Sequence, residues 1–184
     1  MASEIQQQNF VESLFYQDLQ VSPELYDYVR RYQLAKIDHA ATSFYATEMD
    51  VRLAELTMAC VESFFIGVGK RLNKSGLHLL KIWVQKYGEN DYHPIHIHAP
   101  DAFNYSFVFY IECTENSGCT MFYNIGYPYV DHTNFKMQPV KGRCVLFPGG
   151  MPHEAMPNHD DKRMIVSGNI VYFDRDTLVP LPNA

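Results

Sequence analysis

The chain has 184 residues, of which 47% are hydrophobic and 20% are charged, and its formal net charge is −6. This length and composition supply the core of one ordinary domain and exclude intrinsic disorder. The acidic balance argues against nonspecific binding to nucleic-acid phosphates, and no apolar stretch is long enough to span a membrane.

Residues 1–10 are polar and rich in glutamine, so they do not resemble a secretory signal. The four cysteines form no CxxC pair. Free, mostly buried thiols in a chain without a signal are typical of the reducing cytoplasm. We therefore predict a cytoplasmic protein that binds neither nucleic acid nor membrane.

The first part of the chain has the spacing of two helices. Ser22 predicts an N-cap that is followed by Pro23 in the first helical turn. A second helix is predicted to begin near Thr47, with Asp50 three residues later in an approximate capping box. Apolar residues over 53–72 then form one stripe, so we expect this helix to lie flat on a sheet.

From Leu77 onward the pattern changes to short aromatic and β-branched runs that are separated by turn residues. The predicted strands are 77–87, 92–98, 105–113, 119–123, 135–140, 143–147, 153–156 and 163–173. Short strands at this spacing predict a barrel or a two-sheet jelly roll. Because helices precede an antiparallel sheet, the chain is α+β by order although its core is β.

Three histidines lie near the end of the second predicted strand. Alternate residues of a strand point to the same face, so His96 and His98 project into one space. Their separation suits two ligands of one metal ion. His93 is out of step with this pair if the strand is regular through Pro94, so we expect it on the outer or rim side and not as a ligand.

A fourth histidine follows a turn rich in proline and glycine. The strand over 143–147 ends at this turn, and His153 begins the next strand. His153 can therefore complete a three-ligand face at the mouth of the barrel. Imidazole suits iron, zinc, copper or nickel, and catalysis needs an open coordination position.

One arginine stands at the head of the last predicted strand. A guanidinium inside a barrel mouth needs an anionic partner, and a carboxylate bound through two hydrogen bonds is the natural one. From position alone, the alternative is that Arg163 is a surface arginine beside Asp160 and Asp161.

Together these motifs resemble the Fe(II)/2-oxoglutarate-dependent oxygenases, over residues 77–173. The resemblance rests on residues 115–122 (like SGG-L-F), 139–148 (like P-x-x-G-x-x-x-x-F-P), 152–154 (the distal histidine) and 163–171 (like R-I-S-x-S-x-N). The last segment, with Ser167 and Asn169, is similar to a bacterial and phage branch that carries an HxH signature.

The resemblance implies that Fe(II) binds to His96, His98 and His153, and that Arg163 with Ser167 holds 2-oxoglutarate. The usual triad, however, has a carboxylate two residues after the first histidine, where this chain has His98. Three outcomes stay open: an all-histidine face, a face completed by Asp101, or loss of iron chemistry. An all-histidine face leaves the metal more positively charged.

The fold implied by the resemblance is mainly β, a double-stranded β-helix (jelly roll) with the N-terminal helices packed on one sheet. No repeat or linker divides the chain, so we predict one domain over 1–184. It comprises a helical front at 1–76, the β-helix core at 77–173 and a tail at 174–184.

The implied activity is hydroxylase-type oxidation of a small-molecule or peptidyl substrate by O2, with 2-oxoglutarate converted to succinate and CO2. Glu154 and Asn104 are the expected partners that fix the histidine tautomers. A homodimer through the helical front is compatible with this activity.

Two other interpretations remain. One is a cupin-like metalloprotein that does not use 2-oxoglutarate, since residues 142–153 also resemble the second cupin motif. The other is a non-enzymatic β-barrel binding module. An arginine at position 163 distinguishes the oxygenase interpretation from the cupin interpretation, because a cupin has no need of it.

Overall fold

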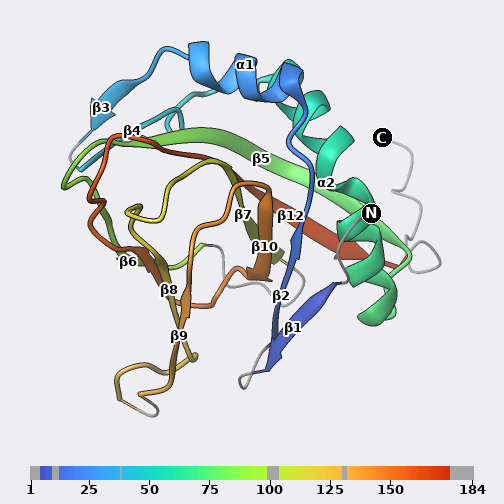
Figure 1. Cartoon of the computed structure of the whole chain (residues 1–184). Helices are drawn as coiled ribbons and strands as arrows, with labels where there is room; N and C mark the ends of the chain where they lie inside the picture. Colours follow the sequence, from blue (N-terminus) through green and yellow to red (C-terminus); the bar gives the residue numbers. More distant parts are fainter. Residues whose placement is uncertain (1–4, 10–12, 38, 99–103, 130–131, 175–184) are drawn as a thin grey trace.

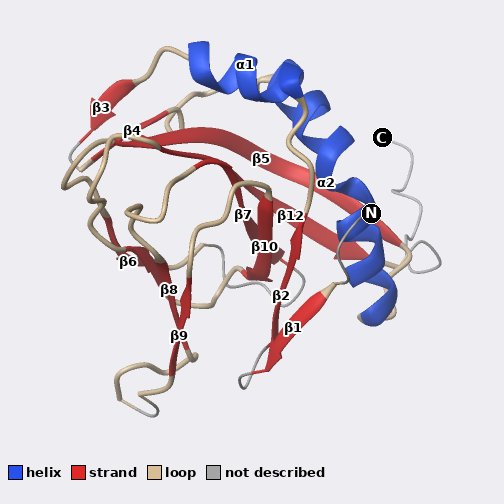
Figure 2. Cartoon of the chain, viewed as in Figure 1, coloured by secondary structure: helices blue, strands red, loops and turns tan. Residues whose placement is uncertain are grey.

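The computed structural model describes residues 5–9, 13–37, 39–98, 104–129 and 132–174. Within these residues there are two helices and twelve strands. The strands form two antiparallel sheets, and both helices cover one face of the larger sheet (Figures 1 and 2). The chain is therefore mainly β, as the sequence predicts.

Eight of the described strands make the large sheet. Their order from edge to edge is β1 (Gln6–Asn9), β2 (Ser13–Asp18), β10 (Arg143–Pro148), β7 (Asn104–Glu112), β12 (Arg163–Phe173), β5 (Gly76–Tyr87), β4 (Ala40–Thr42) and β3 (Ala35–Ile37). The small sheet has the order β6 (His93–His96), β11 (His153–Ala155), β8 (Thr120–Tyr123) and β9 (Asn134–Met137).

The strands predicted after Leu77 are confirmed, with small changes in their bounds. The second is shorter than expected because only His93–His96 pairs with β11. The four strands β1 to β4 were not predicted from the sequence. They are short, and the glutamines of β1 carry no β-strand signal, so their pairing depends on the sheet edges that they join.

Helix α1 (Pro23–Arg31) begins as predicted. The Ser22 hydroxyl accepts the Leu25 backbone N–H at 3.1 Å, and Pro23 occupies the first turn. Its buried residues, Leu25 and Val29, lie one helical turn apart and face the core.

Helix α2 (Val51–Arg71) begins four residues later than the prediction near Thr47. Asp50 is itself the N-cap, because its carboxylate accepts the Leu53 N–H at 2.9 Å. The helix packs on β5, which confirms that it lies on a sheet. In the described part of the chain, no helix is long and apolar enough to cross a membrane.

The large sheet is buried on both faces. Along β7, Phe107, Phe109 and Ile111 belong to the core beneath the helices, whereas Val108 and Tyr110 belong to a second core between the two sheets. Because strand side chains alternate, one strand supplies both cores. This explains the nearly continuous aromatic and β-branched sequence of β7.

The same alternation positions the site. On β12, Met164 and Val166 pack towards the helices. Arg163, Ile165 and Ser167 therefore point into the space between the sheets, and all three line a cavity there.

Candidate metal centre

Three of the sequence-predicted histidines meet between the two sheets. His96 ends β6 and pairs directly with His153, the first residue of β11, and His98 follows β6 by two residues. One ligand nitrogen from each ring lies within 4.8 Å of the others. The ring centroids of His153 are 4.2 Å from His96 and 5.1 Å from His98. This arrangement can hold one metal ion on three imidazoles.

Backbone carbonyls set the tautomers of two of these rings. His96 Nδ1 lies 2.8 Å from Pro94 O, and His153 Nδ1 lies 2.9 Å from Met151 O. Since a carbonyl only accepts, each Nδ1 carries the proton and each Nε2 lone pair is free to bind a metal ion.

The partners proposed from the sequence for this role were different. Glu154 instead accepts a short hydrogen bond from the Tyr123 hydroxyl. The backbone O of Asn104 accepts the Gly149 N–H at 2.8 Å and so contributes to the turn before His153. Within the described residues, His96 and His153 thus have backbone carbonyls, and not Glu154 or Asn104, as the partners of their Nδ1 atoms.

Burial lowers the pKa of each of the three histidines. Burial, followed by the nearby charge of His96, lowers the pKa of His98 to about 4. The pKa of His153, which is only 4% exposed, lies well below its ordinary value, again chiefly through burial. The imidazoles are therefore uncharged at neutral pH, which is the state that binds a metal ion.

His98 joins the triad although it lies beyond the end of β6. Its backbone N–H donates to Gly149 O at 2.8 Å, which ties the segment after β6 to the turn before β11. Asp101, the alternative ligand, lies outside the described residues. The described residues thus assemble the all-histidine arrangement.

His93 is on the inner side, where the sequence argument did not expect it. His153 pairs with His96, but Ala155 pairs with His93, so three steps along β6 match two steps along β11. This bulge changes the alternation of side chains. The His93 ring consequently stacks on His96 at 4.0 Å, and its Nδ1 lies 3.3 Å from the Gln85 amide nitrogen. The expected outer position was wrong because it assumed a regular strand, but His93 does not belong to the candidate ligand group, in agreement with the other part of the expectation.

An inner cavity of about 30 Å³ lies beside the triad. Its walls are Trp83, Gln85, Tyr87, His93, His96, His98, Phe107, Val108, Thr120, Phe147, His153, Glu154, Ala155, Arg163, Ile165 and Ser167. The cavity thus contains the three histidines and both residues predicted to hold 2-oxoglutarate. By volume it holds about two water molecules, which is also the space of one carboxylate group.

Arg163 is a buried cation with unused hydrogen-bonding capacity. The side chain is 1% exposed, and its Nη2 donates to Thr120 Oγ1 at 2.9 Å. The guanidinium carbon lies 4.6 Å from the Tyr87 ring and 5.7 Å from the Tyr110 ring. Nε and Nη1 have no partner, and within the described residues no carboxylate lies at ion-pair distance. Arg163 is therefore not a surface arginine.

Two residues of this cavity region were not predicted from the sequence. The Tyr110 hydroxyl lies 2.6 Å from Thr120 Oγ1, so Tyr110, Thr120 and Arg163 form one hydrogen-bonded chain. Tyr110 belongs to a strand whose aromatic sequence indicates only core packing. Only the register of β12 on β7, where Ile165 pairs with Tyr110, reveals that this phenol approaches Arg163.

A larger groove opens on the same histidines from outside. It has a volume of about 380 Å³, and five of its residues also line the inner cavity. We call it the outer groove, and its lining residues are His39, Ala40, Thr42, Phe44, Tyr45, Trp83, Gln85, Tyr92, His93, Pro94, His96, Ile97 and His98.

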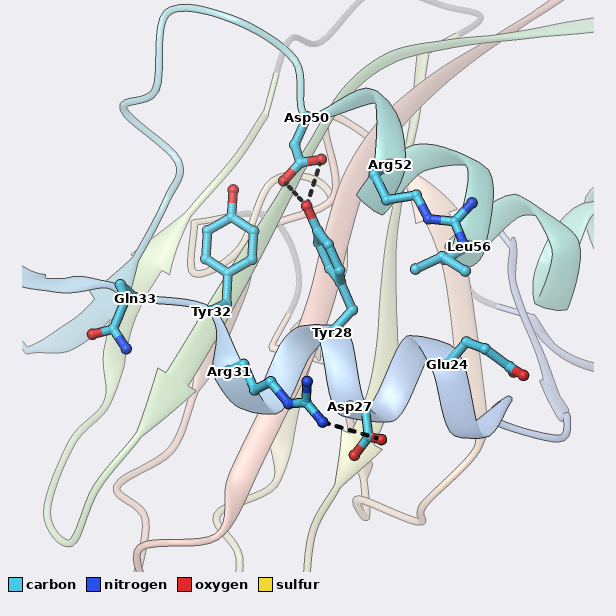
Figure 3. Close-up of a pocket in the computed structure, with 9 residues that line it drawn as sticks. All are labelled: Glu24, Asp27, Tyr28, Arg31, Tyr32, Gln33, Asp50, Arg52 and Leu56. Carbon is cyan, nitrogen blue, oxygen red and sulfur yellow. Dashed lines mark hydrogen bonds and ion pairs between the residues drawn. The ribbon is translucent and has the colours of Figure 1, made fainter.

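The cleft between α1 and α2 is larger, at about 660 Å³, but it has no comparable chemistry (Figure 3). The Tyr28 hydroxyl donates to Asp50 at 2.9 Å, and Arg31 lies 3.7 Å from Asp27 (Figure 3). Arg31 and Asp27 are more than half exposed, so water already satisfies them. The size of this cleft alone does not mark a binding site.

No protein-family model matches the sequence, and no curated protein matches it. Solved structures do match the fold. An oxidoreductase of the 2OG-Fe(II) oxygenase family from Burkholderia pseudomallei is 12% identical with a TM-score of 0.62, over 79% of this chain and 75% of that one. A prolyl-4-hydroxylase from Pseudomonas putida is 15% identical with a TM-score of 0.60, over 89% and 94% of the two chains.

A third similar structure is a non-heme alpha-ketoglutarate-dependent epimerase from nogalamycin biosynthesis. It is 14% identical with a TM-score of 0.61, over 88% of this chain and 78% of the epimerase. At these identities the likeness concerns the fold. The chain therefore has the fold of the 2OG-Fe(II) oxygenases, which confirms at that level the resemblance found in its motifs.

Proposed function

We propose that this protein is a non-haem Fe(II)- and 2-oxoglutarate-dependent dioxygenase. The observation that carries the proposal is the buried, partly unpaired guanidinium of Arg163 in the cavity that also holds three neutral imidazoles. A buried cation without an anion is costly, so the site is built for an anionic ligand. A metal site beside an anion site is what a metal-chelating carboxylate co-substrate needs.

The order of strands supports the finer description of the fold as a double-stranded β-helix. The consecutive strands β5 to β12 alternate between the two sheets, apart from the hairpin of β8 and β9. In each sheet, strands distant in sequence lie side by side, as in a jelly roll.

The donor set fits a catalytic metal ion. Three neutral nitrogen ligands leave coordination positions for a co-substrate and for dioxygen, and imidazole suits Fe(II). In the proposed site His96, His98 and His153 hold the metal ion, and the carbonyls of Pro94 and Met151 keep two of the rings in the binding tautomer.

The co-substrate fits the remaining groups. Its distal carboxylate would accept hydrogen bonds from the free Nε and Nη1 of Arg163, while Nη2 stays bonded to Thr120. Ser167 is 4% exposed and lines the same cavity, so its hydroxyl is the predicted second donor. Because the inner cavity is small, the rest of the molecule must extend towards the histidines and the outer groove.

When bound, Fe(II) and 2-oxoglutarate supply the oxidation of an unreactive bond in the substrate, with succinate and CO2 as co-products. The chain contributes orientation and the exclusion of water. Arg163 fixes the direction of the co-substrate, and the apolar walls Phe147 and Ile165 keep the cavity dry.

The first test is an anaerobic titration of the Fe(II)-loaded protein with 2-oxoglutarate, observed through the weak visible metal-to-ligand charge-transfer band. We expect the band in the parent protein and its loss in Arg163→Met. Arg143→Met is the matched control, because Arg143 forms a partly exposed pair with Asp18 at 2.7 Å outside the cavity. Iron binding without the band would favour a cupin-like protein, and absence of metal binding would favour a binding module.

A further inference from the structure

The outer groove is formed by three segments of the chain. Trp83 and Gln85 of β5 form its floor. One wall comes from residues 39–45, which include β4 and the segment after it. The other wall comes from residues 92–98, which include β6 and the histidines of the candidate metal centre.

Hydrogen bonds hold both walls in place. Ser43 N–H donates to Val84 O at 3.0 Å, which attaches the first wall to β5. The Tyr92 N–H donates to His39 O at 3.1 Å, and the two rings stack with centroids 4.2 Å apart. The groove is therefore largely preformed, as small-molecule sites usually are.

Aromatic rings line the inner end of the groove. Phe44 meets Trp83 edge to face, with centroids 5.0 Å apart and an angle of 81°. Tyr45 meets Phe44 in the same way at 5.2 Å and 86°. Because Phe44 is nearly perpendicular to both other rings, it forms a corner with each in which a flat ligand can contact one ring face and one ring edge at once.

One cation lies beside the groove and is already held by an aromatic ring, since the Lys81 ammonium lies over the Phe44 ring at 3.9 Å from its centroid. In the described lining of the groove there is no aspartate, glutamate, lysine or arginine. A charged ligand would lose hydration without gaining an ion pair there, so the walls favour an uncharged ligand.

One histidine of the groove differs in tautomer from the metal-binding pair. The Gln85 amide nitrogen, 3.3 Å from His93 Nδ1, is a donor only, so Nδ1 accepts and the proton lies on Nε2. His93 therefore offers an N–H donor to the groove, whereas His96 and His153 offer lone pairs. A ligand beside His93 needs a hydrogen-bond acceptor.

We propose that the outer groove binds the substrate and that this substrate is a small, uncharged molecule with a planar aromatic ring next to a hydrogen-bond acceptor. The assignment of this ligand as substrate rests on the proposed oxygenase function. The binding site itself is independent of it.

Trp83 is the only tryptophan of the chain and lies in the groove floor, so its fluorescence reports occupancy directly. We would titrate the metal-free protein with benzamide, which is planar and neutral and has a carbonyl acceptor. The comparison ligands are benzoate, protonated benzylamine and cyclohexanecarboxamide. We expect benzamide to bind at least about tenfold more tightly than either ion, since no side chain in the described lining of the groove is an ionic partner for either ion.

Two exposed tyrosines provide matched variants. Tyr45 is 67% exposed and lines the groove, and Tyr129 is 95% exposed and does not, so neither change should unfold the protein. Tyr45→Ala should weaken benzamide binding about fivefold, and Tyr129→Ala should leave it unchanged. His93→Leu should weaken benzamide while leaving toluene binding unchanged, because only benzamide has an acceptor.

Each contrary result overturns a stated part of the inference. If benzoate or protonated benzylamine bound as tightly as benzamide, an uncharged ligand class would be excluded. Benzoate is also titrated into Arg163→Met, so that its binding in the inner cavity is not counted. Equal binding of cyclohexanecarboxamide would exclude the planar ring. Binding of N-acetylphenylalaninamide at least tenfold tighter than benzamide would reassign the groove to a peptidyl substrate.

The proposed function and this inference fail separately. Formation of the Fe(II)–2-oxoglutarate band without any benzamide binding would overturn the groove assignment and leave the oxygenase proposal intact. Benzamide binding without the band would overturn the oxygenase proposal and leave the groove as a binding site for an uncharged aromatic ligand.

Discussion

The inner cavity and the outer groove share five wall residues, yet they select for opposite kinds of ligand. The cavity is small, at about 30 Å³, and is lined by the buried guanidinium of Arg163. The groove is larger, at about 380 Å³, and aromatic, and its described lining has no charged side chain. The buried cation of the cavity favours an anionic ligand, whereas the uncharged aromatic lining of the groove disfavours an anionic ligand.

Under the proposed function, this difference would let one small two-sheet domain bind two dissimilar molecules at the candidate metal centre. The shared histidines face both spaces, so a ligand in either space lies next to the metal site. The large sheet supplies the buried cation through β12, and Trp83 of β5 together with the segment after β4 supplies the aromatic part of the groove. Changes to either part should therefore affect one ligand and not the other.

The largest expected effect is the loss of metal affinity in a variant that lacks one of the three triad histidines. In His153→Ala, one of three ligands is lost, so we expect metal affinity to fall by more than about 100-fold. Because Trp83 lies 5.7 Å from His98, Co(II) binding should quench its fluorescence in the parent protein and not in the variant.

The control for this change is His159→Ala, which alters an exposed histidine outside the triad. Benzamide binding should survive both changes, since His153 does not line the outer groove. Tight Co(II) binding by His153→Ala would disprove the triad.

Replacement of the buried cation should remove the main property that distinguishes the cavity from the groove. In Arg163→Met, 2-oxoglutarate affinity should fall by more than about 100-fold, because a buried charge-assisted pair is worth about 3–5 kcal/mol when one partner is removed. The ligand-free variant should nonetheless be more stable by about 1–3 kcal/mol, since two unpaired donors disappear.

Chemical denaturation and co-substrate titration of the same samples measure both effects. Arg143→Met should show the opposite pattern, with unchanged co-substrate affinity and slightly reduced stability, because its guanidinium already has a carboxylate partner. A ligand-free Arg163→Met protein that is less stable than the parent would indicate that Arg163 is structural.

Much of the site was predictable because it depends on strand alternation and fixed spacing. His96, His98 and His153 follow from one HxH pair and one turn, and their meeting point requires only that β6 and β11 pair. Arg163 was assigned through the family resemblance, because its place at the head of an apolar strand left a surface arginine open as well. The role of Thr120 was not predicted, since it depends on which strands face each other across the two sheets.

The errors have local physical causes. His93 moved to the inner side through a bulge, which no residue pattern in the sequence indicates. Helix α2 begins later than predicted because Asp50, and not a residue near Thr47, is its N-cap. The Asp50 carboxylate accepts the Leu53 N–H and so fixes the first turn. Strand β2 was missed because its place in the sheet depends on pairing with β10, which lies more than a hundred residues later.

The histidines shared by cavity and groove should make stability depend on pH. Burial lowers the pKa of His93 and His98 to about 4, below the value of about 6.5 in the unfolded chain. Between these values the unfolded chain binds more protons, so the free energy of unfolding should fall as pH falls. After allowance for partial solvent screening, we expect a loss of about 1 kcal/mol per pH unit between pH 6 and 5.

Denaturation of the metal-free protein at several pH values measures this slope. It should be shallower in His153→Ala, which lacks one buried imidazole, and unchanged in His159→Ala, which alters an exposed ring. Equal slopes in all three proteins would mean that the clustered histidines do not cause the acid sensitivity.

The smallest expected effect compares two buried threonines, one inside the cavity and one far from it. Thr120 accepts from Arg163 and is bonded to Tyr110, whereas the Thr57 hydroxyl of α2 is buried without a partner. Thr120→Val should weaken 2-oxoglutarate by about threefold to tenfold, because it releases the guanidinium from its orienting contact. Thr57→Val should leave ligand affinity unchanged and raise stability by about 1 kcal/mol, since it removes an unsatisfied hydroxyl.

Isothermal titration and denaturation of the two isosteric variants separate a hydroxyl that orients a ligand-binding group from one that only occupies space. Equal ligand affinity in both variants would restrict the anion site to Arg163 alone.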